Sequence, residues 1–99
     1  MSTITYEVTA VIREDLRGAF ESYMTEVHMP EVLATGAFLD ARFSTAEPGR
    51  YRASYTARSR EVLDKYLVEH SSRLREDVAK HFLEGVQFSR EEWTTLASF

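Results

Sequence analysis

The chain has 99 residues, of which 43% are hydrophobic and 28% are charged, and it contains no cysteine. This composition is typical of a globular domain; it excludes disulfides and thiolate sites, and no segment approaches the roughly 20 apolar residues that span a bilayer. The 12 basic and 16 acidic side chains give a formal charge of −4, which disfavours binding to nucleic acid or to an anionic membrane. We therefore expect a single cytoplasmic domain over residues 1–99, with no signal peptide.

The first part of the chain predicts a strand followed by a helix. Apolar and polar residues alternate over residues 4–12, which is typical of a strand with one buried face. Over residues 16–27 the apolar side chains recur every three or four positions, which indicates an amphipathic helix. Asp15 is placed to cap its first turn. Because proline disfavours helical geometry in the residue before it, Pro30 predicts that the helix ends or kinks near His28.

Two strands are predicted in the middle of the chain. Alternation over residues 39–44 and 51–58 indicates strands, with Leu39 on the buried face of the first. Residues 47–50 contain Pro-Gly and form the turn between them. A tight two-residue turn alone would set one apolar face against a polar one. We therefore expect a bulge, or a loop with an odd number of residues, at this hairpin.

The last third of the chain predicts a second helix and a final strand. Ser59 is expected to cap the helix, whose apolar stripe runs to residue 82. Two serines at 71–72 interrupt the stripe, so the helix is expected to bend there or to give way to another helix. Alternation returns over residues 86–89 and predicts a strand that reaches toward Trp93.

The element order βαββαβ predicts an α+β fold of the ferredoxin-like sandwich type. Two interleaved right-handed β-α-β crossovers would form a four-stranded antiparallel sheet with both helices on one face. The other face is polar and is expected either to remain solvated or to meet the sheet of a second copy. Phe38 and Trp93 are the candidate aromatic residues on this face. Its polar residues are expected to be Thr5, Glu7, Thr9, Asp40, Arg42, Arg52, Ser54, Thr56, Arg58, Gln87 and Ser89.

Two histidine-bearing segments resemble a known family. Residues 25–38, which contain His28 and Pro30, and residues 67–75, which contain His70, look like segments of the bacterial domain of unknown function 4286 family. The resemblance spans nearly the whole chain. It implies a ferredoxin-like fold related to the dimeric α/β barrels, and it implies no activity. The family often has a proline shortly after the second histidine, where this chain has serine.

Two histidines and two arginines are the candidate ligand-binding residues. His28, at the predicted end of the first helix, can either line a pocket or complement the helix dipole. His70 is the best available general base if it lines a cleft, because the pKa of histidine lies nearest neutrality. Arg42 and Arg52 can grip a carboxylate or another anion with their guanidinium forks. Alternatively, they pair with acidic side chains of the sheet.

These observations favour a small homodimeric domain that binds a small, anionic molecule or acts in regulation. One alternative is a cofactor-independent or haem-linked monooxygenase of the dimeric α/β-barrel type. The chain lacks asparagine, which departs from the asparagine–tryptophan–histidine sites of several such enzymes. The other alternative is a protein-interaction module. No cofactor is predicted. No metal site is predicted either, because His70 and His81 would lie roughly 16 Å apart along a helix, too far for one ion to bind both.

Overall fold

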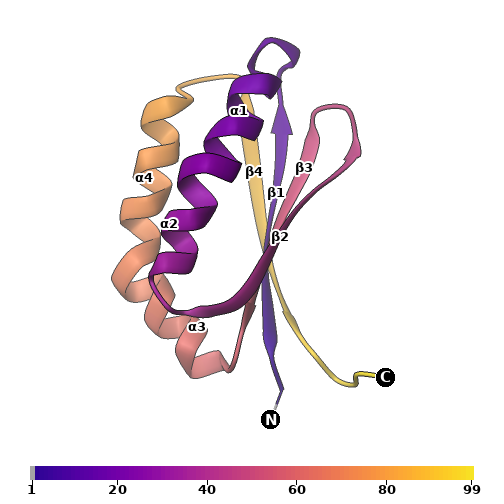
Figure 1. Cartoon of the computed structure of the whole chain (residues 1–99), viewed down its shortest axis with the longest axis vertical. Helices are drawn as coiled ribbons and strands as arrows, with labels where there is room; N and C mark the ends of the chain where they lie inside the picture. Colours follow the sequence, from indigo (N-terminus) through magenta and orange to yellow (C-terminus); the bar gives the residue numbers. More distant parts are fainter. Residues whose placement is uncertain (1) are drawn as a thin grey trace.

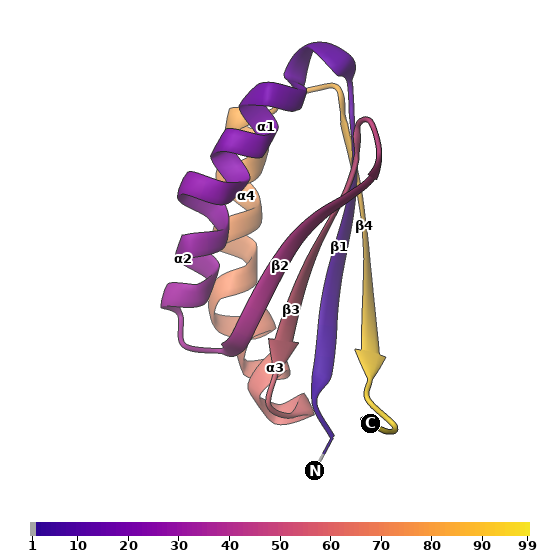
Figure 2. The ribbon, with the colours of Figure 1, turned by 45° about the vertical axis from the view of Figure 1, so that its right-hand side comes forward.

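Four strands form one antiparallel sheet in the order β2-β3-β1-β4 in the computed structural model, which describes residues 2–99. The strands are β1 (Ile4–Ile12), β2 (Phe38–Glu47), β3 (Arg50–Ala57) and β4 (Val86–Thr94). Two long helices lie side by side against one face of the sheet and leave the other face uncovered (Figure 1, Figure 2). The predicted βαββαβ order and the ferredoxin-like α+β architecture are confirmed.

Each helix is interrupted at its middle by a π turn. The first helix consists of a 3₁₀ turn (Glu14–Leu16), α1 (Arg17–Tyr23), a π turn (Met24–His28) and α2 (Met29–Ala34). The second consists of α3 (Arg60–Tyr66), a π turn (Leu67–Ser71) and α4 (Ser72–His81). Because a π turn closes hydrogen bonds over five residues instead of four, it inserts one residue and rotates the side chains that follow.

The sequence predicts an end or a kink of the first helix near His28, and the structure has a π turn there instead of an end. The helix continues as α2, with Pro30 in the first turn of that segment. The π turn just before Pro30 relaxes the regular spacing at the point where proline would otherwise disrupt the helix. Asp15 caps nothing. Its carboxylate instead accepts hydrogen bonds from the Arg13 guanidinium at 2.6 and 3.1 Å.

The π turns also change which side chains are buried. The core contains Met24, the first residue of one π turn, and Met29, which follows that turn. It also contains Tyr66, just before the other π turn, and Ser71, the last residue of that turn. Both pairs are five positions apart, where a regular α-helix would bury pairs three or four positions apart. Val27, which regular helical spacing places in the core, is 39% exposed. The added residue in each π turn is the physical reason for the difference.

Two irregularities set the register of β2. A bulge between Phe38 and Asp40 turns Leu39 to solvent and gives the buried position to Phe38. The predictions that Leu39 is in the core and Phe38 on the uncovered face are therefore both wrong. A second shift, between Thr45 and Glu47, allows a two-residue turn to join β2 to β3. The bulge predicted at this hairpin is confirmed.

The core lies between the sheet and the helices and is rich in aromatic rings. Both layers contribute its largest fully buried side chains, which are Tyr55, Phe20, Ile12, Leu63, Leu74 and Val32. Burying each apolar side chain of this size contributes about 1.5–3 kcal/mol to stability. The ring of Tyr6 lies 6.1 Å from that of Tyr55 and 6.3 Å from that of Tyr66, measured between centroids. This cluster brings three phenol groups into the space between the layers.

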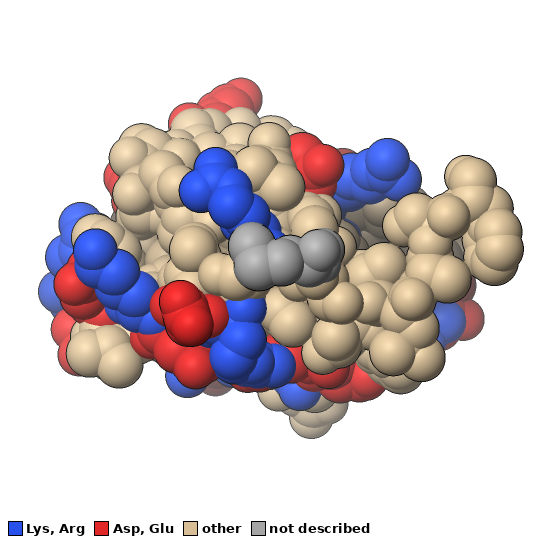
Figure 3. All heavy atoms as spheres, turned by 90° about the horizontal axis from the view of Figure 1, so that it is seen from below, with Lys and Arg blue, Asp and Glu red and all other residues tan. Residues whose placement is uncertain are grey.

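Both ends of the described chain lie at the same end of the molecule (Figure 1). Thr95 pairs there with Thr3, through a backbone hydrogen bond of 3.0 Å and a side-chain hydrogen bond of 2.8 Å. From this end, basic and acidic side chains intermix on the surface, while the uncharged C-terminal segment projects to one side (Figure 3). Within residues 2–99, none of the helices combines the length and the apolar character that a membrane crossing requires.

Candidate functional site

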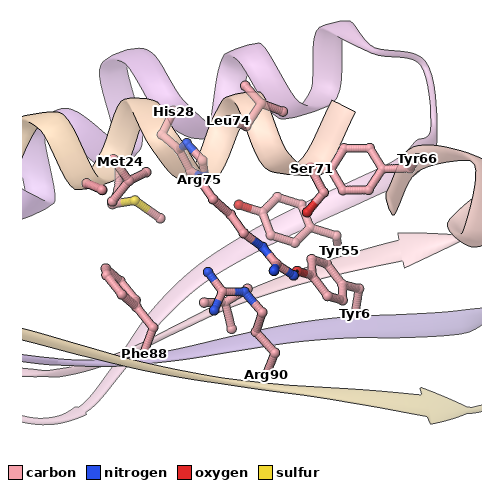
Figure 4. Close-up of a pocket in the computed structure, with 13 residues that line it drawn as sticks. Tyr6, Met24, His28, Tyr55, Tyr66, Ser71, Leu74, Arg75, Phe88 and Arg90 are labelled. Atoms are coloured by element: carbon pink, nitrogen blue, oxygen red, sulfur yellow. The ribbon is translucent and has the colours of Figure 1, made fainter. Parts of the chain in front are cut away.

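A cavity of about 110 Å³ lies between the middle of the two helices and the sheet (Figure 4). Its apolar wall includes Val8, Met24, Leu74, Val78 and Phe88. Its polar groups are three phenols, those of Tyr6, Tyr55 and Tyr66, together with His28, Ser71, Arg75 and Arg90. An apolar space of about 150 Å³ holds a benzene molecule, so this cavity has the scale of one small ring. An apolar pocket with a few converging polar groups is typical of a small-molecule site.

The two π turns both end at this cavity. His28 closes the first π turn and Ser71 closes the second, and both side chains line the space between the helices and the sheet. Ser71 is only 4% exposed, although serine is usually a surface residue. π turns are uncommon and occur frequently at functional sites. The presence of two π turns at one cavity therefore marks this region as a candidate functional site.

Two buried polar atoms at the cavity have no hydrogen-bond partner within residues 2–99. They are the hydroxyl oxygen of Tyr55 and Nδ1 of His28. Tyr55 is 2% exposed, and its hydroxyl points into the space below the helices (Figure 4). A buried polar atom without a partner costs about 1–3 kcal/mol of stability. Both atoms belong to residues that line the cavity.

Both groups are uncharged at neutral pH. Burial lowers the pKa of His28 to about 4; the nearby Asp77 carboxylate acts in the opposite direction, and the Arg90 guanidinium reinforces the lowering. Burial also raises the pKa of Tyr55, with further contributions from the neighbouring phenols of Tyr66 and Tyr6. The cavity thus holds a neutral imidazole and a neutral phenol as hydrogen-bonding groups.

Two arginines give the cavity a positive charge. Arg75 comes from α4 and Arg90 from β4, and their guanidinium groups point toward one another (Figure 4). Arg75 donates a hydrogen bond of 3.0 Å to the Tyr6 hydroxyl, and the Arg90 guanidinium carbon lies 5.8 Å from the centre of the Phe88 ring. Among the described residues 2–99, no aspartate or glutamate lines the cavity. Within residues 2–99, no carboxylate forms an ion pair with either arginine.

The sequence of this chain matches the family model of a domain of unknown function, DUF4286, over residues 3–96. The chain belongs to this family. The resemblance of its two histidine-bearing segments to the family is therefore confirmed. A search of curated proteins finds no significant match to the DUF4286 domain described here.

Two solved structures are similar to this DUF4286 domain. A dimeric ferredoxin-like protein from an uncultured marine organism superposes with a TM-score of 0.70 at 14% sequence identity, over 100% of both chains. Rv0793 from Mycobacterium tuberculosis superposes with a TM-score of 0.69 at 19% identity, over 98% of both chains. At these identities the likeness shows the ferredoxin-like fold alone.

The structure places one of the four predicted ligand-binding residues at the cavity. His28 lines it, whereas Arg42 and Arg52 lie on the uncovered face of the sheet, paired in register with Ser54 and Thr9. The Arg52 guanidinium lies 3.7 Å from a carboxylate oxygen of Glu7. The sheet therefore separates these two arginines from His28, and a ligand role for Arg42 and Arg52 remains a prediction.

His70 is the fourth residue of the second π turn, one position before Ser71, and its surroundings differ from those of His28. It lines a separate depression beside Lys65 and Glu69. Its Nε2 lies 3.9 Å from the Glu69 carboxylate and its Nδ1 lies 3.4 Å from the Arg73 guanidinium. A ligand role for His70 is likewise still a prediction. Within residues 2–99, no group of three histidine or acidic side chains is gathered in a way that could hold a metal ion.

Sequence reasoning missed both cavity arginines, although the pattern contains a signal for each. Arg90 follows Val86 and Phe88 at the next inward position of β4, where a charged residue is unexpected. Arg75 lies four positions after Ser71 and therefore on the same helix face. A charged residue on an inward-facing position is uncommon unless it has a partner or a function.

Proposed function

We propose that this domain is a homodimer that binds a small anionic molecule in the cavity between its helices and its sheet. The observation that carries the proposal is the pair formed by Arg75 and Arg90, which face one another and for which residues 2–99 supply no carboxylate partner. Two like charges repel at short range unless an anion lies between them. Guanidinium groups bind carboxylates and phosphates through paired, charge-assisted hydrogen bonds.

The size and the walls of the cavity narrow the ligand further. Apolar side chains from both helices and from the sheet, such as Met24, Leu74 and Phe88, surround most of the cavity. Its volume of about 110 Å³ matches a single ring or a short branched chain more closely than a nucleotide or another large cofactor. A compact apolar body with one acidic group fits these walls best.

The uncovered face of the sheet is the proposed dimer interface. Trp93 and Val11, on β4 and β1, are 56% and 49% exposed there, and tryptophan is enriched in protein interfaces. The similar protein from the marine organism is dimeric. Because the cavity lies on the opposite side of the sheet, pairing through this face leaves the cavity accessible.

Calorimetric titration with two probes tests the ligand proposal. Benzoate carries the acidic group, whereas benzyl alcohol has a similar size and no charge. We expect the protein to bind benzoate at least about tenfold more tightly, because one charge-assisted hydrogen bond contributes about 1.5–3 kcal/mol. The double variant Arg75→Gln/Arg90→Gln should lose this preference.

Two further variants serve as comparisons. Arg73→Gln removes the same charge from the same helix without altering the cavity wall, and it should bind benzoate as the unaltered protein does. Arg42→Gln/Arg52→Gln alters the uncovered face and should also retain binding. Loss of benzoate binding in the second variant but not in Arg75→Gln/Arg90→Gln would move the site to the uncovered face and contradict the proposal.

A further inference from the structure

The geometry points to a hydroxylated aromatic acid as the ligand class: a single ring whose acid group meets Arg75 and Arg90 and whose hydroxyl group meets Tyr55 and His28. This inference rests on the proposed function, because it assumes an anionic ligand in the cavity. It adds a second recognition point, at the opposite end of the ligand. It also states the chemistry of the group that this point selects.

The cavity is polar at two places that differ in burial. Arg75 and Arg90 are exposed residues whose guanidinium groups reach the cavity from the solvent side. Tyr55 is almost completely buried, and Nδ1 of His28 is inaccessible to solvent. A molecule that enters with its acid group toward the arginines therefore presents its other end to Tyr55 and His28.

The apolar surface between these two places fits a flat ring. Phe88, Met24 and Val8 line the cavity from the strands and the first helix, and the rings of Tyr6 and Tyr66 close another side. Aromatic side chains favour stacked or edge-on contacts with another ring, which contribute about 0.5–1.5 kcal/mol beyond the burial of area. An aromatic ligand thus packs against the walls of the cavity, while its polar groups bind at the two ends.

The inner end selects an uncharged group. The pKa of His28 is lowered to about 4 by burial and the pKa of Tyr55 is raised by burial, so both groups are neutral at pH 7. A second carboxylate would meet a neutral imidazole and a neutral phenol there and would lose its hydration. A ligand hydroxyl both donates and accepts hydrogen bonds. It can therefore supply the missing hydrogen-bond partner of the Tyr55 hydroxyl, of the His28 ring nitrogen, or of both.

Titrations with matched benzoates test this inference. The probes are benzoate, 3- and 4-hydroxybenzoate, and the corresponding fluorobenzoates, in which fluorine approximates the size of the hydroxyl group but does not donate a hydrogen bond. We expect at least one hydroxybenzoate to bind threefold or more tightly than its fluorinated counterpart. One new hydrogen bond to a buried group gives a change of this order.

The variant Tyr55→Phe retains the ring and removes the hydroxyl, and it should lower that preference to less than twofold. An equal preference in Tyr55→Phe, or a preference below threefold in the unaltered protein while the benzoates still bind, would overturn the inference and leave the proposed function intact. If no benzoate binds at all, the proposed function and this inference both fail. The two failures are therefore distinguishable.

Discussion

The two faces of the sheet carry similar residue types in different settings. On the uncovered face, Arg52 lies beside Glu7 and water reaches both side chains. On the covered face, Arg75 and Arg90 meet without a carboxylate at a cavity that also holds unpaired buried atoms. Solvent and a nearby carboxylate account for the first arginine, because exposed ion pairs contribute little to stability. Within residues 2–99 no carboxylate forms an ion pair with Arg75 or Arg90, which makes the covered face the stronger candidate for a ligand.

Substitutions at the β2 bulge should give the largest difference in stability between a covered and an uncovered position. Phe38→Ala removes a buried ring that packs against the rings of Tyr55 and Tyr66, and it should destabilise the protein by about 3–5 kcal/mol. Leu39→Ala, one residue further on, should cost less than about 0.5 kcal/mol, because Leu39 faces solvent. Urea unfolding of both variants measures the difference. Equal losses would contradict the register of β2.

Trp93→Asp should weaken the proposed dimer without affecting the cavity. Tryptophans in interface centres contribute about 2 kcal/mol or more, so the dissociation constant should rise roughly 30-fold or more. Sedimentation equilibrium over a range of concentrations measures the change. Glu61→Asp, on the opposite side of the molecule in α3, serves as a comparison and should leave the dimer unchanged. If the Trp93→Asp protein dimerises normally, the uncovered face is not the dimer interface.

The buried imidazole of His28 should make stability depend on pH. Its pKa is about 4 in the folded protein against the ordinary value of 6.5, so between these values the unfolded chain binds a proton that the folded chain does not. Stability from this group is therefore fully present above pH 6.5 and falls as the pH is lowered toward 4. We expect a loss of about 2 kcal/mol between pH 7 and pH 5.

Urea unfolding at pH 7 and pH 5 measures this loss, with His28→Gln as the reference. The substituted protein should show a loss smaller by about 2 kcal/mol, because its amide does not titrate. Identical pH dependence in the two proteins would mean that His28 is protonated as readily in the fold as in the unfolded chain. That result would contradict its burial at the cavity.

Tyr55→Phe should have a small effect on stability, and one of the opposite sign. Removing a buried hydroxyl that lacks a partner should stabilise the ligand-free protein by about 1 kcal/mol. Thermal unfolding without ligand measures the change. Tyr51→Phe provides the contrast, because the Tyr51 hydroxyl donates to the Glu21 carboxylate at 2.6 Å, and its loss should destabilise the protein. Destabilisation by Tyr55→Phe would show that the hydroxyl already has a partner.

The sequence predicts the fold well where periodicity is regular. The alternation in β1 and the cap at Ser59, whose side chain accepts a hydrogen bond from the Val62 amide at 3.2 Å, are both confirmed. The bulge at the hairpin follows from keeping two apolar faces on one side of the sheet. These features depend only on short-range geometry, which the order of residues encodes directly.

The site is harder to predict because it depends on local departures from regular geometry. The π turns shift the register of each helix by one residue, and the bulge at Leu39 shifts β2 in the same way. Periodicity that assumes regular spacing assigned Val27 and Leu39 to the core. The five-residue spacing of the buried pair Met24 and Met29 is the feature of the sequence that corresponds to the π turn. Arg75 and Arg90 meet only when the second helix and β4 are placed together.

The most direct test of the central claim is an NMR titration of the ¹⁵N-labelled protein with benzoate. The structure predicts saturable shifts of backbone amides around the cavity, at His28 and Ser71 in the π turns and at Arg90 in β4. Amides of Arg42 and Arg52 on the uncovered face should remain unchanged. Saturable shifts confined to the uncovered face, or no saturable shift at any amide, would contradict the claim that the unpaired groups of the covered face form an anion-binding site.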